Sequence, residues 1–148
     1  MSSANNAIIL VARILLSAIF ILSGFGKLTD PAGTASMISQ AGLPMASVLA
    51  YLAGIFELVS GLCVLTGFQT RLVGWALALF CLVTGAIFHA HPISVPGFPD
   101  AANGYLSTMN QIMFMKNITM AGAYILLATY GAGAYSLDAR RSHRPALA

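Results

Sequence analysis

The sequence predicts an all-α integral membrane protein, a bundle of four transmembrane helices. Of its 148 residues, 58% are hydrophobic and only 7% are charged, against about 25% charged residues in ordinary soluble domains. The mean hydropathy is +0.84. Because so few polar residues cannot cover a water-exposed surface, most of the surface must face lipid.

Four apolar runs account for nearly the whole chain. They cover about residues 7–26, 46–67, 71–90 and 110–132, and each approaches the roughly 20 residues with which a helix crosses a bilayer. Helices satisfy their own backbone hydrogen bonds in lipid, which an open sheet cannot do. We therefore expect a single membrane domain, residues 1–148.

The first span has no basic residue before Arg13. A cleavable signal peptide opens with a basic region, so we expect this helix to be retained. In the connection that follows, "TDPAGTASMISQAGLP", Asp30 suits an N-cap and Pro31 the first helical position, while Gly42 stops a helix. This predicts a short interfacial helix over about 31–41 in the first outer loop.

The third connection, "HAHPISVPGFPDAANGYLST", contains three prolines and two glycines. That composition predicts an irregular outer loop before the fourth span.

The arginines predict the orientation of the bundle. Arg71 lies in the tight second connection, and Arg140, Arg141 and Arg144 follow the fourth span. By the positive-inside rule both termini are cytoplasmic, with 133–148 as a cytoplasmic tail. The basic residues are otherwise scattered, so the net charge of +3 does not indicate nucleic-acid binding, which needs a basic surface.

Small residues share a helix face with polar ones in the second and third spans. The two faces are Ala50, Gly54, Glu57 and Gly61, and Gly74, Ala78, Cys81, Gly85 and His89. Small residues allow membrane helices to approach closely. We therefore expect Glu57 and His89 to face the interior of the bundle.

Every span carries an ionisable residue, and the fourth carries Lys116 followed by Asn117. With a rise of ~1.5 Å per residue, Arg13, Glu57 and Lys116 come to depths of roughly 9, 15 and 21 Å from the cytoplasmic edge. His89 comes near the outer edge. Since a charge within a span costs about 3 kcal/mol, we expect Glu57 to pair with the cations that flank it in depth.

Three interpretations of these charges remain open. They can form an ion pair that only fixes helix order, or surround a ligand or proton site, or leave Glu57 protonated and neutral. Lys116 can also extend outward to the membrane surface. The candidate site residues are Arg13, Glu57, His89, Lys116 and Asn117.

Metal and thiol chemistry find little support. His89 and His91 have no obvious third ligand, so we expect no metal site. Cys63 and Cys81 both lie within apolar runs and form no Cys-x-x-Cys pair. Thiol–disulfide relays need exposed, paired thiols, so buried apolar cysteines are the simpler interpretation.

An ordered set of motifs resembles the DoxX family of bacterial four-helix membrane proteins. It comprises "ARILLSAIFILSGFGKLTDP", "GLP", "FELVSGLCVLTGFQTRLVG", "FH", "MKN" with a following "AG", and "GAGAYSLDAR", and it spans nearly the whole chain. The family pattern falls on Arg13, Gly24, Lys27, Glu57, Gly67, Arg71, His89, Lys116, Asn117 and Asp138.

The resemblance implies a multi-pass protein of the bacterial inner membrane that serves a redox system. Some relatives resemble membrane subunits of thiosulfate:quinone oxidoreductases, and others are linked to complexes that handle thiol and oxidative stress. The chain has no dinucleotide fingerprint and no haem-attachment motif. Any cofactor would therefore be a diffusible quinone or belong to an oxidoreductase partner, and the chain would not be a self-sufficient enzyme.

Three functions thus compete. The first is a redox subunit that anchors a partner or holds a quinone or an anion near Glu57. The second is a small proton-coupled transporter, and the third is a structural scaffold. The lipid bilayer is the expected partner in each case, and a homo-oligomer is compatible with all three.

Overall fold

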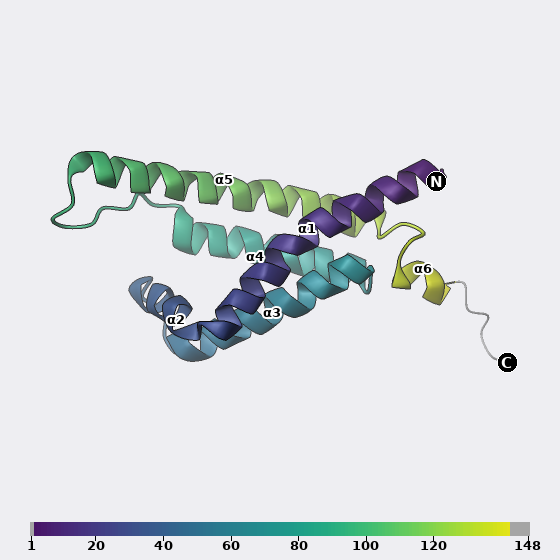
Figure 1. The fold of residues 1–148 in the computed structure, drawn as a ribbon, viewed down its shortest axis with the longest axis horizontal. Helices are drawn as coiled ribbons and strands as arrows, with labels where there is room; N and C mark the ends of the chain where they lie inside the picture. Colours follow the sequence, from purple (N-terminus) through teal and green to yellow (C-terminus); the bar gives the residue numbers. More distant parts are fainter. Residues whose placement is uncertain (1, 143–148) are drawn as a thin grey trace.

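The computed structural model describes residues 2–142 and is all-helical there, with no strand. Its helices are α1 (Ser3–Thr29), α2 (Pro31–Gln40), α3 (Ala46–Thr66), α4 (Thr70–His89), α5 (Asp100–Tyr130) and α6 (Leu137–Ser142) (Figure 1). Helices α1, α3, α4 and α5 are long and apolar enough to cross a membrane. The predicted fold class, an all-α protein with four spans, is confirmed.

Helix α2 forms where the sequence of the first connection predicts a short helix. The Asp30 carboxylate accepts a hydrogen bond from the backbone N–H of Gly33, and Pro31 occupies the first turn. Gly42, with φ of 76°, follows the end of the helix. Helix α2 packs mainly against α3.

Helix α5 begins ten residues earlier than the sequence predicts, at Asp100 rather than near 110. The prediction of an irregular loop up to Thr108 is wrong because all three prolines of that connection precede Asp100. An acidic residue in the first turn complements the helix dipole, and alanines that favour helix follow it. The Asn103 side chain accepts from Val95 N–H at 2.8 Å and so holds the shortened loop against α5.

The bundle is built from two helix pairs, α1 with α3 and α4 with α5. A glycine stands at each close approach. A Cβ at Gly24 of α1 would lie 2.8 Å from the carbonyl oxygen of Gly54 in α3, and one at Gly74 of α4 would lie 2.9 Å from Cβ of Ala128 in α5. The predicted small-residue faces are therefore contact faces.

The two pairs meet around a core in the half of the bundle nearer the start of α1 and the α3–α4 turn. The core residues are Phe20, Val64, Leu77, Ala78, Cys81, Ala121, Tyr124 and Leu127. The rings of Phe20 and Tyr124 meet edge to face with centroids 5.5 Å apart, and the Tyr124 hydroxyl donates to the Leu16 carbonyl at 2.7 Å. These contacts join α5 to α1.

The beginning of α1, the α3–α4 turn and α6 lie together at one end of the bundle, here called the terminal end, and α2 lies at the opposite end (Figure 1). The sequence predicts only a tail beyond 132, whereas the structure forms α6 within it. The Asp138 carboxylate accepts from the backbone N–H groups of Gln69 and Thr70, both at 2.8 Å, and so caps the start of α4. Arg144 of the predicted arginine cluster lies outside the described residues.

Candidate functional site

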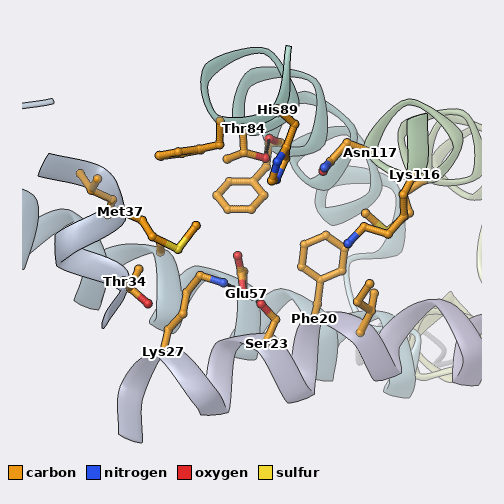
Figure 2. Close-up of a pocket in the computed structure, with 16 residues that line it drawn as sticks. Phe20, Ser23, Lys27, Thr34, Met37, Glu57, Thr84, His89, Lys116 and Asn117 are labelled. Atoms are coloured by element: carbon orange, nitrogen blue, oxygen red, sulfur yellow. Dashed lines mark hydrogen bonds and ion pairs between the residues drawn. The ribbon is translucent and has the colours of Figure 1, made fainter. Parts of the chain in front are cut away.

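A cavity of about 280 Å³ lies between the two helix pairs, in the half of the bundle nearer α2 (Figure 2). Five helices contribute to its wall, and most of that wall is apolar, with Phe20, Phe80 and Phe88 among the lining side chains. Its polar lining residues are Ser23, Lys27, Thr34, Glu57, Thr84, His89, Lys116 and Asn117.

Glu57 forms an ion pair with Lys27 on the α1–α3 side of the cavity. Lys27 Nζ lies 2.8 Å from Glu57 Oε2 and also donates to Ser23 Oγ at 2.6 Å. The Glu57 side chain is only 6% exposed and that of Lys27 is 25% exposed. The expectation that Glu57 pairs with Arg13 and Lys116 is wrong.

Arg13 instead serves the terminal end and does not line the cavity. Its guanidinium donates to the carbonyls of Val64 at 2.9 Å, Ala132 at 2.9 Å and Tyr135 at 2.8 Å, and also to that of Leu65. The residue is 1% exposed. It therefore ties the last turn of α3 and the segment after α5 to α1 through their backbone carbonyls.

Side-chain direction explains both findings. Helical side chains lean toward the N-terminus of their own helix. Those of α1 therefore lean toward the terminal end, which carries Arg13 away from Glu57 and Lys27 toward it. In the antiparallel α3, Glu57 leans the other way and meets Lys27. The depths of the Cα atoms alone could not reveal this.

His89 reaches the cavity from the opposite wall, at the end of α4 (Figure 2). Its Nδ1 lies 2.7 Å from Oδ1 of the buried Asn110 on α5. His91 does not line this cavity but lines a second, more polar one of about 390 Å³ that also borders His89. Within residues 2–142, no group of three potential ligands lies close enough to hold a metal ion.

Lys116 and Asn117 complete the wall that faces Lys27 and Glu57 (Figure 2). Lys116 Nζ contacts the thioether sulfur of Met113 at 3.3 Å, and the amide of Asn117 donates to the Met113 carbonyl at 2.9 Å. A thioether is a weak acceptor, so the Lys116 ammonium keeps donor capacity for a ligand. Lys116 turns inward and does not extend to the membrane surface.

Four of the five candidate residues therefore share the cavity, and Arg13 is remote from it. Residue-by-residue reasoning missed two members of this region, Lys27 as the ion-pair partner and Asn110. A signal for Asn110 exists, because Asn103, Asn110 and Asn117 recur at seven-residue spacing on one face of α5. Such a polar stripe indicates a face turned from lipid.

The fold and the cavity define a small four-span membrane protein with ionisable side chains gathered inside its bundle. The chain belongs to the DoxX family, because the family model described as DoxX matches residues 8–90. It is a multi-pass inner membrane protein.

Curated relatives support this assignment. Two are from Escherichia coli (strain K12). The "Inner membrane protein YqjF" is 36% identical over 93% of this chain and 95% of its own length, and the "Inner membrane protein YphA" is 36% identical over 93% of each. The "Putative oxidoreductase CatD" of Bacillus subtilis (strain 168) is 32% identical over 70% of this chain and 73% of its own length. No solved structure matches the chain.

Proposed function

We propose that the protein is the membrane subunit of a bacterial redox system and binds the head group of a quinone in the cavity. One observation carries the proposal. Two opposite walls of an apolar, aromatic cavity each present a hydrogen-bond donor and an acceptor, Lys27 with Glu57 on one side and Lys116 with His89 on the other (Figure 2).

The residues present fit such a ring. A quinone has two carbonyl oxygens on opposite sides of its ring, and Lys27 and Lys116 can each donate a hydrogen bond to one of them. The reduced form offers two hydroxyl groups, from which Glu57 and His89 can each accept a hydrogen bond. The volume of about 280 Å³ is near the lower limit of small-molecule pockets, roughly 300 Å³, and so suits one ring.

The three charged residues of the cavity then have defined tasks. When bound, the quinone supplies two-electron, two-proton redox chemistry. Lys27 holds Glu57 in place, Glu57 gives or takes a proton at its carboxylate, and Lys116 orients the ring. The electrons come from an oxidoreductase partner, since the chain has no motif for a redox centre of its own. The name of the Bacillus subtilis relative supports a redox role.

Titration of the purified protein in lipid nanodiscs with a short-chain ubiquinone and a short-chain menaquinone tests this. Thermal unfolding, followed by the fluorescence of Trp75, should shift upward as ligand is added. Glu57→Gln and Lys116→Met should each weaken binding about tenfold, or 1.4 kcal/mol.

The matched control is Thr129→Val, on the exposed surface of α5, whose hydroxyl bonds only to its own helix at the Ile125 carbonyl. It should bind like the wild type. No thermal shift in the wild type, or equal affinity in Glu57→Gln, would count against the proposed cavity function.

A further inference from the structure

Asn110 has its amide orientation determined by its neighbours. It is 7% exposed, and its Nδ2 donates to the carbonyls of His91 at 2.8 Å and of His89 at 3.4 Å. Since the amide nitrogen must face these two acceptors, the amide oxygen must face the His89 ring. The distance from Oδ1 to Nδ1 of His89 is 2.7 Å.

An amide oxygen can only accept, so Nδ1 of His89 must carry the hydrogen. A neutral imidazole with hydrogen on Nδ1 has its lone pair on Nε2. Figure 2 shows the His89 ring pointing into the cavity. The ring can then present an acceptor to a ligand there.

We propose that Asn110 is a positioning residue that fixes the tautomer of His89, so that this end of the cavity selects a ligand carrying a hydroxyl donor. The ionisable groups that share the cavity are Lys27, Glu57 and Lys116, from α1, α3 and α5, and α2 contributes uncharged side chains. Glu57 is engaged by Lys27. On the opposite wall, a lone pair on Nε2 of His89 is then an acceptor that can bind a hydroxyl but not a carbonyl.

The ligand part of this inference rests on the proposed function, and the tautomer part does not. Without Asn110, the ring is free to carry its hydrogen on Nε2, which would replace the acceptor by a donor. Both variants lose the amide donor to the His89 and His91 carbonyls, but Asn110→Asp keeps an acceptor for Nδ1–H and Asn110→Leu does not. The pair of variants therefore separates hydrogen bonding from a general loss of structure.

The first arm of the test is NMR of ¹⁵N-histidine-labelled protein in nanodiscs at about pH 8, with the His89 signals assigned by their loss in His89→Gln. Wild type and Asn110→Asp should show the hydrogen on Nδ1, and Asn110→Leu should lose this signature. Asn103→Ala, on the same face of α5 but bonded to the outer loop, should keep the wild-type spectrum. A hydrogen on Nε2 in the neutral wild type overturns the inference, whatever the variants do.

The second arm compares binding of a short-chain ubiquinol with that of its bis-methyl ether. The ether should bind at least tenfold more weakly to wild type and Asn110→Asp, and this ratio should fall toward one in Asn110→Leu. An unchanged ratio in a folded Asn110→Leu overturns the selectivity. If neither compound binds but the hydrogen is on Nδ1, the proposed function fails while the tautomer assignment stands. If the quinol binds but the hydrogen is on Nε2, the tautomer assignment fails while the proposed function stands.

Discussion

At the scale of single residues, the direction of a side chain decides which charges meet. Arg13 and Lys27 lie on the same helix, and the sequence places Arg13 nearer the middle of the span. Yet Lys27 reaches the buried carboxylate while Arg13 binds only carbonyl oxygens among its described hydrogen-bond partners. A guanidinium suits that role because it holds several donors in a fixed planar arrangement.

Arg13→Lys should destabilise the protein by about 2–4 kcal/mol, because one ammonium cannot reach carbonyls on two separate segments and each charge-assisted bond contributes about 1.5–3 kcal/mol. Chemical unfolding in mild detergent, followed by Trp75 fluorescence, measures the change. Arg71→Lys, an exposed basic position, should stay within about 0.5 kcal/mol of wild type. Equal losses of unfolding free energy in Arg13→Lys and Arg71→Lys would contradict a special structural role of Arg13.

A double-mutant cycle on Lys27 and Glu57 separates a structural role from a binding role. Lys27→Met and Glu57→Leu should each cost about 2–4 kcal/mol because the remaining charge is left unpaired, somewhat less than for a fully buried pair since Lys27 is partly exposed. The double variant should be more stable than the worse single one. If the folded double variant still bound quinone like wild type, the charges would be structural only.

Sequence alone predicted Glu57, His89, Lys116 and Asn117 as candidate site residues, and the structure brings all four to one cavity. It could not give the ion-pair partner of Glu57, because that depends on side-chain lean and on which helices are neighbours. Lys27 lies at the end of the first span, beyond the predicted run 7–26, and its side chain leans back toward the interior to reach Glu57.

At the scale of helices, glycine positions determine the pairing. Gly24 and Gly26 differ by two residues, yet only Gly24 faces α3, where an added Cβ would meet the backbone of Leu58 and Gly54. Nothing lies within 4 Å of a Cβ at Gly26. The two positions form a natural matched pair.

Gly24→Ala should cost about 1–3 kcal/mol, because the obstructing atoms are backbone and the helices must move apart. Gly26→Ala should be neutral or slightly stabilising, since alanine favours helix more than glycine does. Thermal unfolding of both variants in the same detergent tests the contrast. Similar melting temperatures for the two variants would contradict a close α1–α3 contact at Gly24.

Helix α6 is held at the α3–α4 turn by Asp138. Burial alone would raise the pKa of this carboxyl, but hydrogen bonds from Thr70 and Gln69 and the charge of Arg141 outweigh it and lower the pKa. A carboxyl with a lowered pKa in the folded state contributes stability above its ordinary pKa, and loses that contribution as the pH falls through the folded value.

Asp138→Asn should therefore reduce stability by about 1–2 kcal/mol at pH 7, the usual range for a helix cap. The difference from wild type should be constant above about pH 5 and should shrink as the pH falls below the ordinary value of 3.8. Unfolding measured for both proteins across this range gives the comparison. A difference that grows on acidification would contradict the lowered pKa.

At the scale of the whole molecule, hydropathy predicted four spans correctly, because lipid imposes one length on every crossing helix. It misplaced the start of α5, which continues beyond any hydrophobic run: 31 residues extend about 46 Å, well beyond a hydrocarbon core of ~30 Å. The first turns of α5 are polar, so a search for apolar runs cannot detect that they are helical. The cavity also lay beyond sequence reasoning, since it forms only where the two helix pairs meet.

The sidedness of the bundle stays a prediction and can be measured with single cysteines in a Cys63→Ala, Cys81→Ala background. Ser94→Cys, in the loop between α4 and α5, should react with a membrane-impermeant maleimide in intact spheroplasts. Ser3→Cys, at the start of α1, should react only after permeabilisation. The opposite pattern would show that the termini face outward.

The partners of Arg13 also bear on how the protein is made. Two of the carbonyls that receive its guanidinium belong to Ala132 and Tyr135, 119 and 122 residues further along the chain. During synthesis the first helix therefore leaves the ribosome with a charge whose final ligands do not yet exist. A lone arginine in a helix is costly in lipid, so the first span should stay beside the insertion machinery until the last span arrives. The set of acceptors around Arg13, begun by Val64 and Leu65 of α3, is then complete only when the whole chain has been made.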